Sequence, residues 1–453
     1  MTVQNDNDFK QERESDVNKI IESTHPKKVI VAGPGTGKSF LFEQVIKKKK
    51  LEGKSNFLAI TFIGKLGDSL ADDLAGLAKT MTLHGFARQF MYDQCPSGWK
   101  YYPKMKAIIK EDLELSGISS FEIGDENYKN RTIFYKAIGE DDVIHYSVQA
   151  LKNDNSKIPK YDLILVDEFQ DFNEIESELI DLLALKNEIL IVGDDDQALY
   201  EFKGSSPKHI RLKYDPANTQ FESHTLRFCS RCTEVIIRSF HNIVNQFNLN
   251  KNGSNRIDKE YICYLPDKKR DSDLNNKIVV FKNTKIGLIP YKIKAELLKL
   301  LGSQKVKSVL VIGEGQTCQS ILMSIAKKLR WFGFRNIDHS LSTNQEFQFR
   351  QEIIEGYKIL ALNNNDPLAW RLIIPSVYKK DDWKKMVNEN ISNPTKFVES
   401  VPTKLKRTHI SYANTLSKIL NKSSSSVRVI AESSISNLGK MIVTSRRPDR
   451  EVM

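Results

Sequence analysis

At 453 residues the chain is too long for a single hydrophobic core, so we expect two or three domains. Its 40% hydrophobic and 28% charged residues are ordinary for a soluble globular protein, and no apolar stretch approaches the roughly 18–20 residues of a membrane span. The formal net charge of +11 favours a polyanionic partner, usually nucleic acid, although a merely lysine-rich protein would carry the same excess.

The N-terminal residues and the cysteines predict a cytoplasmic protein with no membrane contact. Residues 1–16 are polar and acidic and lack the apolar segment of a signal peptide. The five cysteines are scattered without a disulfide framework, which fits a reducing compartment. Cys229 and Cys232 form a C-x-x-C, but a structural zinc site needs a second pair, so we expect small buried residues there instead of metal ligands.

Short apolar runs that alternate with helix-length amphipathic segments predict a parallel α/β sheet. Each of the first four runs ends at residues able to do chemistry, and ligands of such sheets bind at the carboxyl ends of the strands. The fifth run belongs to a second α/β unit that begins near Ile278 and continues into a helix at Gln319–Phe332. The expected strands are Lys28–Ala32, Phe57–Thr61, Leu163–Val166, Ile189–Val192 and Val309–Ile312.

The first strand runs into the glycine-rich segment "AGPGTGKSF", which predicts a phosphate-binding P-loop. Its glycines let backbone N–H groups curl around phosphate oxygens, Lys38 adds a positive charge, and the Ser39 hydroxyl can ligate Mg²⁺. The expected nucleotide-binding residues are Gly33, Pro34, Gly35, Thr36, Gly37, Lys38, Ser39 and Phe40.

Between His84 and Lys160 the chain changes to Lys-, Tyr- and acid-rich sequence with helical spacing, as in Met105–Leu115, which predicts an inserted helical subdomain. The next strand ends at Asp167 and Glu168. One carboxylate can hold Mg²⁺ and the other can align and deprotonate an attacking water. Such carboxylates are often plain turn residues, but the P-loop upstream favours the catalytic interpretation.

The segment "IVGDDDQALYEFKG" places three aspartates after the fourth strand, followed by Gln197, Tyr200 and Phe202. The triplet could be a cation-binding site, a solvated turn, or part of a longer functional motif that includes the glutamine and the aromatic residues. Farther on, residues 251–273 are polar and predict an extended surface segment.

These motifs resemble, in order and spacing, those of the UvrD/Rep-like superfamily 1 helicases. The resemblance rests on residues 33–39, "AITFIGKLGDSL", "MTLHGFARQF", "VDEFQD" and "VGDDDQALYEFKG", and it is strong over the first half of the chain and weaker beyond. It implies an α/β fold of two RecA-like P-loop NTPase domains with parallel sheets, a helical insertion in the first domain and a small helical insertion in the second.

By this resemblance we expect the following domains. They are residues 1–86 (first part of RecA-like domain 1A), 87–158 (helical insertion 1B), 159–210 (second part of 1A), 211–375 (RecA-like domain 2A), 376–426 (reduced 2B-like helical segment) and 427–453 (divergent C-terminal segment of 2A).

The resemblance also assigns roles to matching residues. Gln197 would bond the γ-phosphate and the attacking water, and Arg231 would reach the γ-phosphate from the second domain as an arginine finger. The triplet would then be the turn that aims Gln197, so Gln197→Ala should uncouple hydrolysis from DNA binding, whereas Asp195→Asn should do much less. The catalytic set is Lys38, Asp167, Glu168, Gln197 and Arg231, the Mg²⁺ ligands are Ser39 and Asp167, and the DNA contacts are Thr61, Phe62, His84, Phe86, Tyr200 and Phe202.

The chain departs from the family at several places. Ser230 replaces the stacking tyrosine beside the arginine finger, and Phe40, which replaces an arginine, is expected to pack against adenine. Two late family motifs, one that couples DNA to ATP and one that supplies a second arginine to the γ-phosphate, are not readable after the serine run at 423–426.

Two functions therefore stay open. The first is an ATP- and Mg²⁺-dependent single-stranded DNA translocase or helicase. The second is an ATP-controlled DNA-binding sensor that works within a larger complex, for example with a nuclease partner in anti-phage defence.

Overall fold

The computed structural model describes residues 6–62, 70–74, 76–94, 98–197, 204–250, 256–274, 278, 282, 285–301, 310–312, 317–334, 345–390 and 393–422. The chain forms two compact units, which are described one at a time. The first comprises Met1–Lys277 and Lys380–Val401, and the second Ile278–Lys379 and Pro402–Met453.

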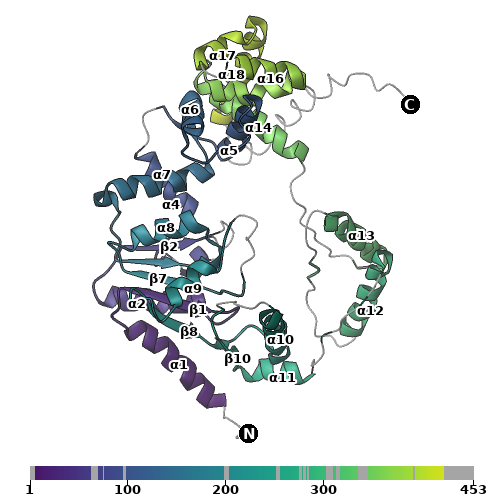
Figure 1. Ribbon diagram of the computed structural model, residues 1–453. Coiled ribbons are helices and arrows are strands. Elements are labelled where there is room, and N and C mark those ends of the chain that lie inside the picture. The colour runs from purple at the N-terminus through teal and green to yellow at the C-terminus, as the bar shows by residue number, and fades with distance from the viewer. Residues whose placement is uncertain are drawn as a thin grey trace. The chain divides into compact units, whose positions relative to one another are not determined.

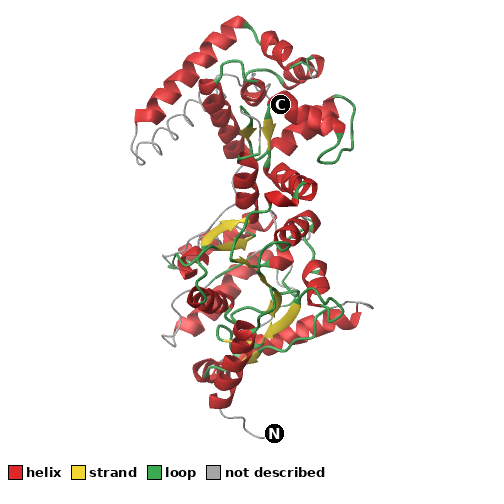
Figure 2. Cartoon of the chain, turned by 90° about the vertical axis from the view of Figure 1, so that its left-hand side faces the viewer, coloured by secondary structure: helices red, strands yellow, loops and turns green. Residues whose placement is uncertain are grey.

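The first unit is built on a six-stranded sheet in the order β3-β2-β6-β7-β1-β8 (Figures 1 and 2). Every pair of neighbouring strands is parallel, as expected for strands joined by helical crossovers. The strands are β1 (Lys27–Ala32), β2 (Phe57–Thr61), β3 (Lys79–Thr82), β6 (Leu163–Val166), β7 (Ile189–Gly193) and β8 (Glu222–Leu226).

Alternate residues of the central strands pack into separate cores on the two faces of the sheet. On one face Val29, Ile60 and Ile164 pack with α4 (Leu83–Tyr92), α7 (Glu140–Asn153), α8 (Glu174–Leu183) and α9 (Lys208–Tyr214). On the other face the neighbouring residues Ile30, Ala59 and Leu165 pack with α1 (Asp6–Glu22) and α2 (Lys38–Leu51). This period of two makes a three-layer α/β domain.

The parallel α/β fold is confirmed, and the four strands predicted before residue 200 are found within one residue. Sequence analysis missed the two edge strands, β3 and β8, because their sequences, "KTMT" and "ESHTL", are polar and only partly buried. Since β8 pairs with β1, the sheet continues past residue 210, where the first domain was expected to end.

The predicted helical insertion is present in the first unit. It contains α5 (Met105–Leu115), with the bounds that the sequence predicts, α6 (Glu126–Tyr135), α7 (Glu140–Asn153) and the two-residue strands β4 (Lys100–Tyr101) and β5 (Ala137–Ile138). Two late helices, α16 (Lys380–Glu389) and α17 (Pro394–Ser400), belong to the same unit, and Phe397 packs on Phe134 with ring centroids 6.0 Å apart (Figure 1). The described part of the expected 2B-like segment, 376–426, is therefore mainly helical and is divided between the two units.

The rest of the first unit follows β8. It consists of β9 (Phe228–Cys229), α10 (Glu234–Asn250), β10 (Ile262–Cys263) and α11 (Pro266–Leu274), and β9 and β10 form a parallel pair. These elements fall in the range that the sequence assigned to domain 2A, but they share a compact unit with the P-loop.

The second unit is helical in the part that the structure describes, where it contains no strand. Of the predicted strand Val309–Ile312, residues 310–312 are irregular and exposed, so the strand is wrong there, and Val309 lies outside the described residues. The helix predicted at Gln319–Phe332 is confirmed as α13 (Thr317–Trp331). The other helices are α12 (Ile289–Leu301), α14 (Gln345–Leu362), α15 (Pro367–Ile373) and α18 (Thr403–Lys422).

The second unit has its own core where α14, α15 and α18 meet. Trp370 is fully buried, and the Tyr357 hydroxyl lies 2.6 Å from Nδ1 of the buried His409. Across both units, no described helix is long and apolar enough to span a membrane. The expected segment 427–453 and the second RecA-like sheet lie outside what the structure describes and stay predictions.

Phe397→Ala should loosen the helical insertion without affecting the sheet. Phe397 is almost fully buried against Phe134, and deletion of such a ring costs about 3–5 kcal/mol. We expect faster amide hydrogen exchange in α6 and α17 and unchanged exchange in β1 and β7. Lys396→Ala, an exposed neighbour on the same helix, should leave exchange unchanged. Equal protection of α6 in both variants would contradict this docking.

Candidate nucleotide site

The loop between β1 and α2 has the backbone of a phosphate cradle. Gly35 and Gly37 have φ values of 69° and 94°, which side-chain-bearing residues rarely adopt, and Gly37 precedes the first turn of α2. The Thr36 hydroxyl donates to the Gly33 carbonyl at 2.9 Å and closes the turn. In the general motif G-x-x-x-x-G-K-S, Ala32 stands at the first position. The N–H groups at the start of α2 suit an anion.

The predicted carboxylates lie at the end of β6, next to this loop. Lys38 Nζ is 2.9 Å from Glu168 Oε1, so the P-loop lysine and the acidic turn are in direct contact. Burial raises the pKa of Asp167 to about 6 against the opposing charge of Lys38. Burial alone would also raise the pKa of Glu168, but the charge of Lys38 and a hydrogen bond from Gln170 lower it below its usual value. The hydroxyl of Ser39 and the carboxylate of Asp167 are oxygen donors of the kind that Mg²⁺ prefers.

Glu168 also has an uncommon backbone conformation. Its φ of 51° and ψ of 42° place a non-glycine residue in the left-handed region. Such strain costs on the order of 1–3 kcal/mol and is concentrated at functional sites. The turn is held by the Glu168 N–H, which donates to Asp167 Oδ1 at 2.9 Å, and by the short helix η2 (Phe169–Asp171) that follows.

Gln170 connects this acidic turn to the turn after β7. Its Nε2 donates to Glu168 Oε2 at 2.9 Å, and its Oε1 accepts from the Asp194 N–H, also at 2.9 Å. Its side chain is almost fully buried. The amide therefore fixes the distance between the two turns, because its nitrogen bonds to one turn and its oxygen to the other.

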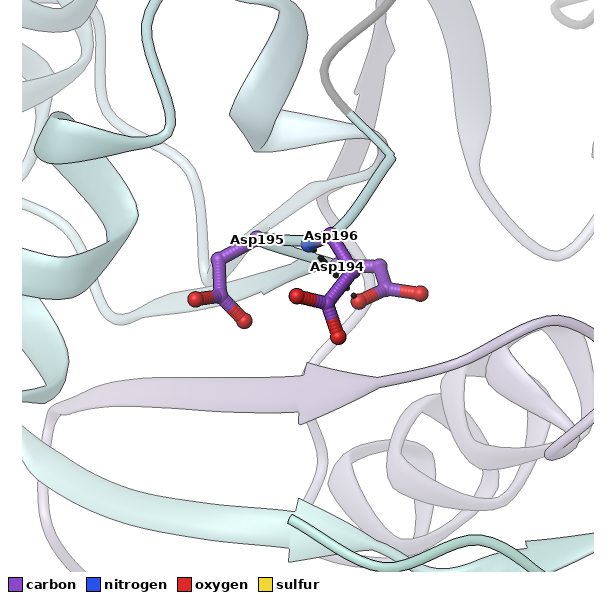
Figure 3. A group of neighbouring side chains, drawn as sticks. All are labelled: Asp194, Asp195 and Asp196. Atoms are coloured by element: carbon purple, nitrogen blue, oxygen red, sulfur yellow. Dashed lines mark hydrogen bonds between the residues drawn. The ribbon is translucent and has the colours of Figure 1, made fainter. Parts of the chain in front are cut away.

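The aspartate triplet is buried and bonded to cations of the chain itself. Figure 3 shows its three carboxylates on one side of the turn after β7. The Lys259 ammonium lies 3.0 Å from a carboxylate oxygen of Asp194 and 3.0 Å from one of Asp196, and it also contacts Asp195. Arg211 binds Asp195 at 2.8 Å, and Arg256 binds Asp196 with two nitrogens, at 2.7 and 2.9 Å.

Three carboxylates and three cations make this cluster electrically balanced. The carboxylate oxygens lie within 4.8 Å of one another, close enough to share a metal ion, but the Lys259 ammonium lies among them. Burial lowers the pKa of Lys259, but the three carboxylates raise it above its usual value overall. The triplet is thus neither a solvated turn nor an open cage. That Asp195→Asn disturbs the coupling of hydrolysis to DNA binding much less than Gln197→Ala stays a prediction.

Sequence analysis missed the segment that supplies Lys259 and Arg256. We expected residues 251–273 to be an extended surface segment, but within it Ile257, Lys259 and Tyr261 are buried while Asp258 and Glu260 are exposed. This alternation is that of an extended chain with one face inward. A lysine is buried only when a partner matches its charge. The sequence did not predict the burial of Lys259 because its partners lie more than sixty residues earlier in the chain.

Residues 229–231 pack directly on the P-loop. The Gly35 carbonyl accepts from the Ser230 N–H at 2.9 Å and from its hydroxyl at 3.0 Å, and the Cys229 thiol donates to the Pro34 carbonyl at 3.1 Å. A Cβ on Gly35 would lie 2.3 Å from the Arg231 Cβ, so only glycine fits. The charge of Arg231 also lowers the pKa of Glu168. Arg231 therefore lies at the nucleotide site, within the unit that contains the P-loop.

Phe40 is on the first turn of α2 with 41% of its surface exposed. The Arg13 guanidinium lies 5.1 Å from its ring centre and 5.6 Å from that of Tyr264, so the cation contacts both rings. Sequence analysis identified neither Arg13 nor Tyr264. Adenine packing by Phe40 stays a prediction.

The residues expected to contact DNA differ in how far their side chains are buried. Thr61 and Phe86 are buried, and Phe86 packs in the core on the apolar face of α4, so both side chains are covered in this structure and their assignment to DNA stays a prediction. Phe62 is half-buried beside Phe172, and His84 Nε2 lies 3.6 Å from Glu176 Oε1. Tyr200 and Phe202 lie outside the described residues.

Gln197 is described, but its side chain points into the turn. Its Nε2 donates to a carboxylate oxygen of Asp194, and its N–H donates to the Asp194 carbonyl at 3.1 Å. A role at the γ-phosphate stays a prediction for this residue.

Comparison with known proteins agrees with this geometry. The family model described as an AAA domain matches residues 17–203, which include the P-loop, both acidic turns and the helical insertion. The ATP-dependent DNA helicase Rep of Buchnera aphidicola is 29% identical over 292 residues, covering 60% of this chain and 41% of that protein. DNA helicase II of Haemophilus influenzae is 39% identical over 104 residues, which are 22% of this chain and 13% of that one. The chain is a relative of the UvrD/Rep helicases.

This UvrD/Rep-like chain spans about two fifths of the length of the Rep proteins that it matches. A further relative is the exonuclease/helicase protein RexA of Lactococcus lactis, 26% identical over 195 residues, which cover 39% of this chain and 16% of that protein.

Asp195→Asn should strongly destabilise the first unit. The change removes the carboxylate that pairs with Arg211 and one of the three that surround the fully buried Lys259 ammonium, and breaking a buried ion pair from one side costs about 3–5 kcal/mol. Urea unfolding followed by intrinsic fluorescence should show a clearly lower midpoint. Asp258→Asn, an exposed acid on the adjacent segment, is the matched control and should keep the wild-type midpoint. Equal midpoints for the two variants would show that the network contributes nothing.

Proposed function

We propose that the chain is an ATP-dependent motor on single-stranded DNA, a translocase or helicase that couples ATP hydrolysis to strand movement. The observation that carries the proposal is the contact of Lys38 with Glu168, together with the Gln170 link to the turn that bears Gln197. A P-loop lysine, an acidic pair and a second polar turn at the carboxyl ends of neighbouring parallel strands are the parts that nucleoside triphosphate hydrolysis needs.

Each part has a role that its surroundings support. The P-loop N–H groups and Lys38 bind the phosphates, and Ser39 and Asp167 would hold Mg²⁺, which neutralises charge on the phosphates. Glu168, whose pKa is lowered, is ionised at neutral pH and can accept a proton from the attacking water. Gln170 holds that carboxylate in place.

Arg231 and the net positive charge complete the proposal. Arg231 packs on Gly35 and adds positive charge beside Glu168, where it can stabilise negative charge that develops on the transferred phosphate. The net charge of +11 suits the phosphate backbone of a DNA strand. Residues Phe62, His84, Tyr200 and Phe202 are proposed to contact the bases.

Steady-state ATP hydrolysis by the full chain, with and without single-stranded DNA, tests this function. We expect DNA to stimulate hydrolysis. We expect Lys38→Ala and Glu168→Gln to lower kcat by roughly 100-fold or more, since each removes a charge that acts in the transition state. Lys48→Ala, a lysine on the far end of the same helix, should keep wild-type kcat. Robust hydrolysis by Glu168→Gln would refute its role as the base.

A second function is an ATP-controlled DNA-binding sensor that works within a larger complex. It is favoured by the lack of readable late motifs and by the match to a protein named as an exonuclease/helicase component. The two functions differ in turnover and movement. A sensor would bind single-stranded DNA more tightly with ATP yet show no displacement of a labelled complementary strand, whereas a motor would displace it.

A further inference from the structure

Lys259 occupies a position that a metal ion could take. Its side chain is fully buried, and its ammonium contacts a carboxylate oxygen of each of Asp194, Asp195 and Asp196. A buried ammonium of this kind is stable only because its charge is matched. Removal of its charge leaves three carboxylates facing two arginines, so the turn cannot keep its geometry unchanged.

The same extended segment carries a second contact to the site, two residues later. A Cβ on Gly33 would lie 2.2 Å from the Tyr261 ring, so the ring packs against the first glycine of the P-loop. The Tyr261 hydroxyl donates to Asp194 Oδ1 at 3.3 Å, and the Ile257 N–H donates to Asp195 Oδ2 at 3.1 Å. Residues 257–261 thus touch the P-loop with a ring and the Gln197 turn with a backbone N–H, a hydroxyl and an ammonium.

We propose that Lys259 is a positioning residue of the ATP site. Its ammonium neutralises the aspartate triplet in place of a metal ion. Together with Tyr261 it fixes the P-loop relative to the turn that bears Gln197. This inference rests on the proposed ATPase function. Asp194 is central to it because this residue accepts from Gln197 and Tyr261 as well as pairing with Lys259. A displaced Asp194 carboxylate would therefore release the Gln197 side chain.

Chemical rescue of Lys259→Ala tests the proposal. The substitution removes three carbons and the ammonium, which n-propylammonium can replace in the cavity. We expect kcat for ATP to fall at least 10-fold with a smaller change in KM, and millimolar n-propylammonium to restore kcat at least 3-fold. The uncharged n-propanol should restore nothing, because the cage requires a cation. A lysine that only stabilised the fold would lower the amount of active protein and leave kcat per folded molecule unchanged.

Lys213→Ala is the matched control. Lys213 is also a buried lysine, but it pairs with Asp181 on α8 and not with the aspartate triplet. Its kcat should stay within about twofold of wild type, with no response to the amine. Thermal midpoints recorded alongside report the folded fraction of each variant.

The outcomes separate the two proposals. A wild-type chain with no ATP hydrolysis, with or without DNA, overturns the proposed function. An active wild type whose Lys259→Ala variant keeps its kcat, or whose loss n-propylammonium does not reverse, overturns the inference and leaves the function standing. If Lys259→Ala does not fold, Tyr261→Ala, which keeps all three charge pairs, replaces it. It should raise the KM for ATP at least 5-fold, and unchanged kcat and KM would overturn the inference.

Discussion

The geometry of the nucleotide site depends on the neutralisation of three buried carboxylates by cations from two other parts of the chain. Asp194, Asp195 and Asp196 directly follow the buried strand β7, and their side chains are almost fully buried. Their charges are tolerable only because Arg211, Arg256 and Lys259 match them. Arg211 is on α9 and the other two come from an extended segment, so the cluster joins three parts of the sequence.

From this cluster a continuous series of polar contacts reaches the acidic pair and the P-loop. The backbone of Asp194 holds Gln170, Gln170 holds Glu168, and Glu168 holds Lys38. Tyr261 links the triplet to the P-loop a second time, since it contacts both Asp194 and Gly33. Each turn at the carboxyl ends of the strands is therefore located by its neighbours as well as by the sheet, which is how catalytic groups are held to the precision that chemistry demands.

The sequence predicted the central strands of the sheet better than its edge strands or the cations that pair with the aspartate triplet. Strands β1, β2, β6 and β7 are continuous apolar runs because both of their faces are buried, and such runs are readable. Strand β8 was missed because an edge strand needs fewer apolar residues. Glycine and acid motifs are local in the chain and predicted that the P-loop and the acidic turn lie together, whereas the role of Lys259 depends on partners that are distant in sequence. For Phe86 the position in a motif and the helical spacing point in different directions, since the motif suggests DNA contact, which stays a prediction, while α4 directs its side chain into the core.

The pairing of β8 with β1 has a practical consequence for dissection of this chain. β1 leads into the P-loop and lies between β7 and β8, so a fragment that stopped at residue 210 would expose one whole side of β1 as unpaired backbone N–H and C=O groups. Such an edge pairs readily with other chains. The same fragment would lack all three cations around the aspartate turn, since Arg211, Arg256 and Lys259 all follow residue 210. The smallest piece able to preserve the phosphate loop must therefore extend beyond Tyr261, well into the stretch that motif comparison alone assigns to another domain.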